Sequence, residues 1–289
     1  NGTLLDKWEI KTNTENNGES ILSDVAKAVD NKLAQEAISK DDVQGIGIGV
    51  PGPVDSQGVV HRCVNLGWGV VNVAEELGNL TGLKIKVGND ANVAALGEMW
   101  QGGAKGSKDV IMVTLGTGVG GGIIVDGKVV AGFNGAGGEI GHITVNNDEI
   151  EACNCGQYGC LEQYTSATGI VRLAKRKLAK STEETSIREI PNLTAKDVFD
   201  AAKAGDAAAL EITEEFGAYL GQALVNLAAT VDPAVFVIGG GVSKAGDILL
   251  ETVRKYFYDH AFYGNQKTKI TLATLGNDAG IYGAAKQVL

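Results

Sequence analysis

Three cysteines and one histidine in the middle of the chain have the spacing of metal ligands. Cys153, Cys155 and Cys160 follow His142, and three thiolates with one imidazole fill the tetrahedral shell that Zn²⁺ prefers. A shell made only of protein atoms indicates a structural metal. The alternative is disulfide pairing, since Cys63 makes the number of cysteines even. We expect a cytoplasmic chain, because no secretion signal is recognisable, and this expectation favours zinc.

Asp90 lies between a short predicted strand, 84–87, and a predicted helix, 91–100. A carboxylate at this point can accept a proton from a substrate hydroxyl, and the adjacent helix dipole favours a negative charge there. The same position is also common for an aspartate that only caps a helix. The residue alone does not separate a general base from an N-cap.

Two glutamates flank the predicted metal loop. Glu139 precedes His142 by three residues, and Glu162 follows Cys160 by two. Each carboxylate can accept two hydroxyl donors, so the pair suits a polyhydroxylated ligand beside a rigid loop. Taken singly, each glutamate is better explained as an ordinary surface residue.

A glycine-rich run after the predicted strand 110–115 indicates a phosphate-binding loop. The run contains the pattern G-x-G-x-x-G, which in dinucleotide-binding proteins opens a helix. Here the β-branched residues 123–125 follow, so we expect the run to turn the chain between two strands. Backbone N–H groups in such a loop can cradle phosphates, although a tight hairpin is the alternative. The expected phosphate contacts are Gly116, Thr117, Gly118, Val119, Gly120, Gly121 and Gly122.

A second glycine loop has a different geometry. Gly239, Gly240 and Gly241 follow a predicted strand, 235–238, and precede a predicted helix that Ser243 can cap. The N-terminus of that helix could face a nucleotide. Close packing of the strand on the helix explains the same glycines equally well.

Strands and helices alternate along the chain, which predicts an α/β fold. A second unit is expected to begin near Asp109. Apolar runs predict strands at 43–50, 84–87, 110–115, 123–125, 128–130, 235–238 and 270–275. Helical spacing of apolar residues predicts helices at 18–38, 73–80, 91–100, 167–180, 194–204, 207–229, from 241 to about 258, and 279–289.

The net charge of the chain argues against two classes of binding partner. A formal net charge of −10 without a compensating basic stripe disfavours nucleic acid and anionic membranes. The most basic stretch, 172–180, is typical of a solvated helix face. No apolar run is long enough to span a bilayer. Neither nucleic acid nor a membrane is therefore an expected partner.

Taken together, the motifs resemble those of the ROK family, which comprises bacterial sugar kinases and related repressors of the actin-like ATPase superfamily. The cysteine motif with its upstream glutamate and histidine is the most specific part. The matching segments keep the family's order and cover nearly the whole chain: 49–55, Asn65-Leu66-x-Trp68, Asn89-Asp90-Ala91-Asn92, 116–122, 138–142, 153–162 and the Gly239 loop.

The resemblance implies an α/β, two-lobed actin-like ATPase fold, related to ribonuclease H, with a zinc-binding loop. Residues 1–108, completed by the C-terminal helix 278–289, would form the small lobe. Residues 109–277 would form the large lobe with the zinc and nucleotide loops. The implied reaction is phosphorylation of the primary hydroxyl of a hexose by ATP with Mg²⁺, with glucose as the expected acceptor.

The resemblance also implies a role for each matching residue. Asp90 would be the base, and Gly239–Gly241 would lie by the adenosine. The 116–122 run would hold the phosphates. Sugar contacts would come from Asn65, Asn89, Glu139, His142 and Glu162, and zinc would be held by His142, Cys153, Cys155 and Cys160, which leaves Cys63 as a free thiol.

Several expectations remain open at this stage. The acceptor could be fructose, mannose or an N-acetylated hexosamine such as N-acetylmannosamine. A sugar-sensing repressor would need an N-terminal helix-turn-helix. A carbohydrate-binding protein without catalysis would leave the two nucleotide loops unexplained. We expect a homodimer. Family members open with a strand and an Asp-x-Gly-Gly-Thr phosphate loop, and because Asn1-Gly2 is a hairpin signal, we expect such a strand before it and incomplete activity without it.

Overall fold

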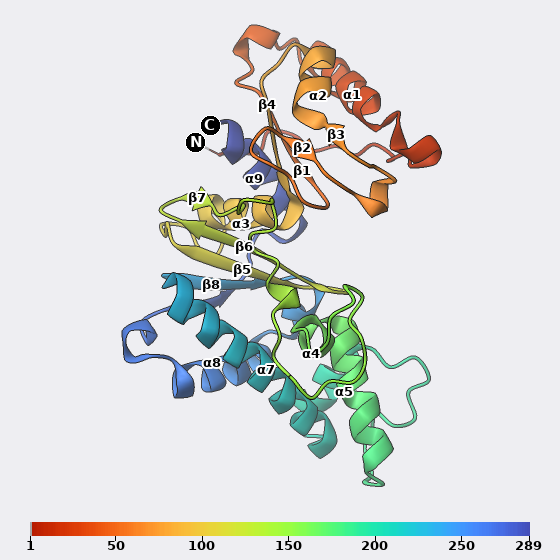
Figure 1. The fold of residues 1–289 in the computed structure, drawn as a ribbon, viewed down its shortest axis with the longest axis vertical. Helices are drawn as coiled ribbons and strands as arrows, with labels where there is room; N and C mark the ends of the chain where they lie inside the picture. Colours follow the sequence, from red (N-terminus) through yellow and green to blue (C-terminus); the bar gives the residue numbers. More distant parts are fainter. Residues whose placement is uncertain (1) are drawn as a thin grey trace.

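The computed structural model describes residues 2–289 and contains a five-stranded and a two-stranded sheet with a pair of helices between them (Figure 1). In the larger sheet the order is β7-β6-β5-β8-β9, with β5, β8 and β9 parallel and β6 and β7 antiparallel to their neighbours. In the smaller sheet β1 pairs with β4 in parallel, and a short antiparallel pair, β2–β3, lies beside it. The strands are β1 Ile46–Val50, β2 Val59–Val60, β3 Val71–Asn72, β4 Ile85–Asn89, β5 Val110–Leu115, β6 Val119–Val125, β7 Lys128–Val129, β8 Val235–Gly239 and β9 Lys269–Leu272.

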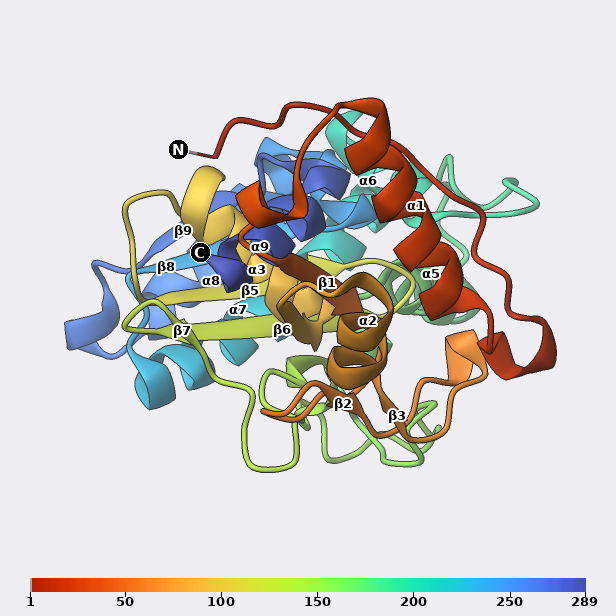
Figure 2. The ribbon, with the colours of Figure 1, turned by 90° about the horizontal axis from the view of Figure 1, so that it is seen from above.

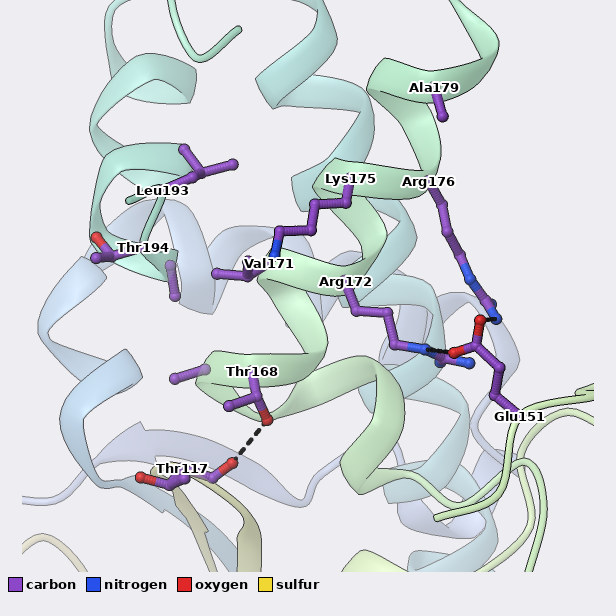
Figure 3. A pocket seen from close by; sticks show the side chains of 12 residues that line it. Thr117, Glu151, Thr168, Val171, Arg172, Lys175, Arg176, Ala179, Leu193 and Thr194 are labelled. Atoms are coloured by element: carbon purple, nitrogen blue, oxygen red, sulfur yellow. Dashed lines mark hydrogen bonds and ion pairs between the residues drawn. The ribbon is translucent and has the colours of Figure 1, made fainter. Parts of the chain in front are cut away.

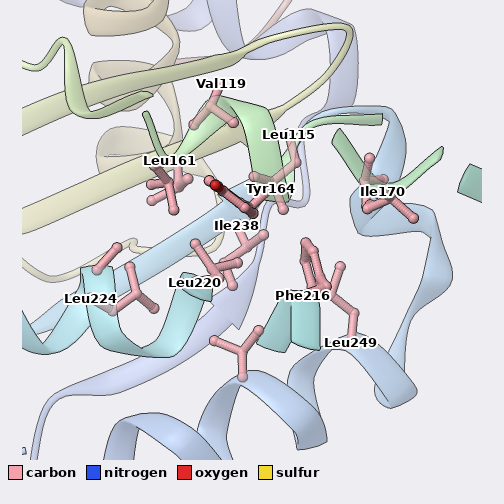
Figure 4. Close-up of a cluster of buried hydrophobic side chains, with 14 of the residues drawn as sticks. Leu115, Val119, Leu161, Tyr164, Ile170, Phe216, Leu220, Leu224, Ile238 and Leu249 are labelled. Carbon is pink, nitrogen blue, oxygen red and sulfur yellow. The ribbon is translucent and has the colours of Figure 1, made fainter. Parts of the chain in front are cut away.

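The central strand β5 buries both faces, as strands covered on two sides do. Ile111 and Val113 belong to the larger hydrophobic core, which α7 and α8 cover with side chains such as Phe216 (Figure 4). Val110 and Met112 point the other way, into a smaller core beneath α3. The α-helices are α1 Ile21–Gln35, α2 Val73–Thr81, α3 Asp90–Gln101, α4 Glu162–Thr165, α5 Ala167–Lys180, α6 Ala195–Lys203, α7 Ala207–Val231, α8 Asp247–His260 and α9 Ala279–Val288.

Helices α3 and α9 lie between the two sheets (Figure 1). Their backbones approach closely because both contribute glycines to the contact. A Cβ on Gly97 would overlap the carbonyl of Ala279, and one on Gly283 would overlap that of Val93. Helix α9 also packs on β1 and β4, so the C-terminal helix returns to the smaller sheet.

The N-terminal segment runs beside α1 without regular secondary structure (Figure 2). Lys32 of α1 forms an ion pair with Asp6 and lies 5.5 Å from the centre of the Trp8 ring. The hairpin signal at Asn1 lies outside the described residues. Among residues 2–289, no helix combines the length and apolarity needed to cross a membrane.

The structure corrects two local predictions. The glycine run does not turn the chain along its whole length, because β6 begins at Val119 and includes three of the glycines. The helix expected directly after Gly241 is instead a 3₁₀ segment, Gly241–Ala245, and α8 begins only after Gly246. Ser243 lies inside that 3₁₀ segment and donates its hydroxyl to Gly240 O at 2.7 Å, so it does not cap α8.

Candidate active site and metal site

His142, Cys153, Cys155 and Cys160 come together as their spacing predicts. One ligand atom from each lies within 4.8 Å of all the others. The Cys155 and Cys160 sulfurs are 3.7 Å apart, and the Cys153 sulfur lies 3.9 Å from His142 Nδ1. Zinc–sulfur bonds of about 2.3 Å at tetrahedral angles place two sulfurs about 3.8 Å apart. The donor set and its dimensions therefore fit zinc, and all four cysteines, including the buried Cys63, are free of disulfides.

The thiols of this group differ in their electrostatic surroundings. Burial raises the pKa of Cys160 to about 12 and also raises that of Cys153. The backbone N–H of Gln157 lowers the pKa of Cys155. Since a metal binds the thiolate, loading this site must release protons.

Asp90 is the first residue of α3, and its side chain is exposed. The N-cap is its neighbour Asn89, whose Oδ1 accepts the N–H groups of Ala91 and Asn92 at 3.0 and 3.2 Å. The Asn89 amide also donates to Gly52 O at 3.2 Å. The interpretation of Asp90 as the helix cap is therefore wrong, because Asn89 already satisfies the helix end.

The start of β6 is the point where the predicted site segments meet. The strand has no side chains at its three glycines, so other segments can lie directly against it. On one face, a Cβ on Gly122 would lie 2.6 Å from the Cβ of Ala95 in α3. On the other, a Cβ on Gly121 would lie 2.5 Å from Ile140. The helix that begins with Asp90 and the 3₁₀ segment Ile140–His142 are thus held on opposite faces of one strand.

Glu162 joins the glycine turn to the cysteine loop. Its Oε2 accepts the N–H of Val119 at 3.0 Å, and its Oε1 lies 3.5 Å from the Cys153 sulfur. Glu139 directly precedes the Ile140–His142 segment and is exposed. Asn65 lies exposed on another 3₁₀ segment, Val64–Leu66.

The two glycine loops line one cavity of about 510 Å³. Gly116 and Thr117 contribute from the turn between β5 and β6, and Gly241 contributes from the end of β8. The remaining wall comes mainly from α6, including Phe199 and Lys203. A cavity with two backbone-rich loops on one side is suited to a nucleotide.

Nearly the whole chain is similar to known proteins. The family model described as "ROK family" matches residues 1–289. The chain belongs to the ROK family. A glucokinase from Halalkalibacterium halodurans is 45% identical over 287 residues, which cover 98% of this chain and 87% of that protein.

Solved structures of ROK-family proteins have the same fold as this chain. A ROK glucokinase from Streptomyces griseus, in complex with glucose and AMPPNP, matches with a TM-score of 0.76 and 35% identity, over 99% of this chain and 92% of that one. A ROK transcriptional regulator, a homologue of the E. coli MLC protein, matches with a TM-score of 0.81 and 27% identity, over 93% of this chain and 68% of the regulator. The actin-like ATPase fold of the ROK family is thus the fold of this chain.

A second cavity in this ROK protein, of about 750 Å³, adjoins the first along α5 (Figure 3). The two cavities share Thr117, and Thr168 at the start of α5 donates its hydroxyl to Thr117 O at 2.9 Å. Sequence reasoning missed Thr168, because an isolated threonine at a helix start carries no signal beyond capping.

The basic stretch on α5 is not a simple solvated face. Arg172 and Arg176 both pair with Glu149, whose side chain is 1% exposed, and with Glu151. Glu149 also accepts the Tyr164 hydroxyl at 2.5 Å. The guanidinium of Arg176 holds the pKa of Glu149 well below its usual range. These contacts fasten the segment before Cys153 to α5.

Proposed function

We propose that this protein transfers the γ-phosphate of ATP to the primary hydroxyl of glucose. The observation that carries the proposal is the meeting of three segments at the start of β6: the Asp90 end of α3, the glycine turn, and the segment Glu139–His142. A base, a phosphate-binding turn and polar side chains suited to a sugar are what a hexose kinase requires. The glucokinase names of the relatives, and the glucose and AMPPNP in the Streptomyces griseus structure, support the same function.

Asp90 is the proposed base. Phosphoryl transfer has a loose transition state, so catalysis depends chiefly on positioning and on neutralising charge. An exposed carboxylate at the end of β4 can hold the sugar hydroxyl in line with the phosphate and accept its proton. The proposed phosphate contacts are residues 116–122 with Mg²⁺ bound to the nucleotide, and Gly239–Gly241 would lie beside the adenosine.

The proposed sugar contacts are Asn65, Asn89, Glu139, His142 and Glu162. Two of them have hydrogen bonds within the protein that fix their direction. Glu162 is held by the Val119 N–H, and Asn89 by the end of α3. Such preformed contacts reduce the entropy lost when the sugar binds.

Zinc would be held by the three thiols and by Nδ1 of His142, the ring nitrogen that lies toward Cys153. The ion would supply a rigid tie for the loop. Nε2 of His142 is then left to bond a sugar hydroxyl, so the metal would fix the direction of a substrate contact.

A repressor is the second candidate, because a ROK regulator matches this fold with a TM-score of 0.81. An enzyme assay distinguishes a kinase from a repressor. Full-length protein should release ADP when glucose, ATP and Mg²⁺ are all present, and omission of any one should abolish the release. Full-length, zinc-loaded protein that turns over neither glucose nor another hexose would rule out the kinase.

We also propose that the kinase acts in the cytoplasm, where ATP and hexoses meet, and that it is a homodimer. Light scattering on the purified protein tests the second statement, and a mass of one chain, 29.9 kDa, would contradict it.

A further inference from the structure

Glu98 is a carboxylate that the proposed reaction does not use. It lies on α3, eight residues after Asp90, which is about 12 Å along the helix. The residue is 0% exposed. Across residues 2–289, no lysine, arginine or histidine forms an ion pair with it. A buried carboxylate of this kind is costly unless other groups satisfy it.

The groups that satisfy Glu98 are backbone N–H donors from two segments far apart in the sequence. Gly103 donates to Oε2 at 2.7 Å. The backbone N–H of Thr274 donates to both carboxylate oxygens at 3.1 Å, and the N–H of Leu275 donates to Oε1 at 2.9 Å. Hydrogen bonds to a charged acceptor are roughly twice as strong as neutral ones. Glu98 therefore ties residues 103 and 274–275 firmly together.

These two segments are where the chain passes between its two sheets. Residues 102–109 lead from α3 into β5, and residues 273–278 lead from β9 into α9. The first crossing leaves room for the carboxylate, and for the end of β9, at two glycines. A Cβ on Gly103 would lie 2.6 Å from Leu272 O, and one on Gly102 would overlap the Glu98 carboxylate.

We propose that Glu98 is the pivot about which the two lobes close around ATP and glucose, and is thereby a positioning residue for phosphoryl transfer. The proposal rests on the kinase function above and on lobes 1–108 and 109–277. Three N–H groups bonded to one buried carboxylate hold both crossings at a fixed separation, so closure rotates the lobes about this point. Helix α3 connects this point to Asp90, which lies at the other end of the same helix. Displacement of a reacting group by 1 Å can cost about a hundredfold in rate.

The first test is Glu98→Gln. The amide keeps the size of the side chain but replaces one acceptor oxygen by a donor, so one crossing loses its bond. At a temperature where the variant is fully folded, we expect kcat to fall at least about tenfold, while the Kd of glucose changes less than about threefold. Small-angle scattering should show a smaller contraction on adding glucose and AMPPNP than in the wild type.

The matched control is Asp206→Asn. Asp206 also binds backbone N–H groups, those of Ser186 and Ala209, but it caps α7 away from both crossings. This variant should melt earlier while keeping kcat within about twofold of the wild type. A Glu98→Gln variant whose kcat also stays within twofold would overturn the pivot and leave Glu98 as a purely structural residue.

A second measurement needs no variant, and it can still overturn the pivot if Glu98→Gln fails to fold. In the wild type, the amides of Gly103, Thr274 and Leu275 should exchange at least about a hundredfold more slowly than free peptide amides, with and without glucose and AMPPNP. Fast exchange of any of the three in either state contradicts a pivot. Failure of the wild type to phosphorylate glucose would instead overturn the proposed function.

Discussion

The two ends of α3 carry carboxylates in opposite situations. Asp90 is exposed at the first residue and is not needed to cap the helix, since Asn89 does so. Glu98 is fully buried near the last turn and accepts three backbone N–H groups. The exposed carboxylate accepts only the N–H of Ala91, at 2.8 Å, among the hydrogen bonds of the described residues, whereas the buried one accepts N–H groups from two distant segments.

A third carboxylate shows a different way to satisfy a buried charge. Glu149 is held by Arg172 and Arg176, whereas Glu98 has only N–H donors. The two arginines are partly exposed, so this ion-pair group lies at the edge of the larger hydrophobic core, to which Tyr164 belongs. Burial and partners thus distinguish Asp90, the proposed base, from two carboxylates that hold structure, and the following variants test that distinction.

The largest expected effect is at the exposed end of α3. Asp90→Asn should lower kcat by about 10²–10⁴-fold while the Kd of glucose stays within about threefold. The amide keeps the shape of the carboxylate and can still bond the hydroxyl, but it cannot accept the proton. Steady-state ADP release and calorimetry measure the two quantities. A variant that keeps more than a tenth of the wild-type kcat would leave Asp90 without the role of base.

Cys155→Ser should affect the segment that faces α3 across β6. We expect zinc content, melting temperature and glucose affinity to fall together, because the site both ties the loop and directs His142. Zinc affinity should also weaken as pH falls, since the thiols must lose protons to bind. Cys63→Ala is the control, because Cys63 is buried outside the metal group and should change stability but not zinc content. Wild-type protein purified without chelator and free of zinc would contradict the metal site.

Glu149→Gln should destabilise the protein by about 1–3 kcal/mol at neutral pH, because the arginines lose a charged partner. The native pKa of Glu149 lies below the unfolded value of 4.5, so its ionised form stabilises the fold above that value. This stabilisation is lost as pH falls below 4.5. Between about pH 6 and pH 3, the melting temperature of the variant should therefore change less with pH than that of the wild type. Glu151→Gln, at an exposed partner of the same arginines, should behave like the wild type.

The smallest expected effect is at the cap itself. Asn89→Ala should cost about 1 kcal/mol of stability, and Asn89→Asp should cost less because aspartate caps equally well. Chemical denaturation measures both. If Asn89→Ala left stability unchanged, the assignment of the cap to Asn89 would fail, and Asp90 would again be explained as a structural residue.

The order of the longer elements could be predicted from the sequence because apolar periodicity reports burial, whereas the short elements β2, β3 and α4 were missed. The prediction of α5 as residues 167–180 is confirmed, and so is that of β5 as residues 110–115. The family and the Cys₃His group were also predicted correctly, since ligand types and spacing carry that information.

The remaining features depend on contacts between segments distant in the sequence. The glycines of β6 were assigned wholly to a turn, because nothing local shows that α3 and residues 138–140 press on the strand's two faces. The role of Glu98 had no local signal either, since its donors lie up to 177 residues away. The basic face of α5 was misjudged for the same reason, because Glu149 reaches it from the cysteine loop.

The most direct test of the account is a comparison of acceptors for full-length protein with ATP and Mg²⁺. The value of kcat/KM should be measured for glucose, fructose, mannose and N-acetylmannosamine by coupled ADP release. The account predicts that glucose has the highest value. Another acceptor preferred by tenfold, about 1.4 kcal/mol in transition-state binding, would contradict the assignment of glucose.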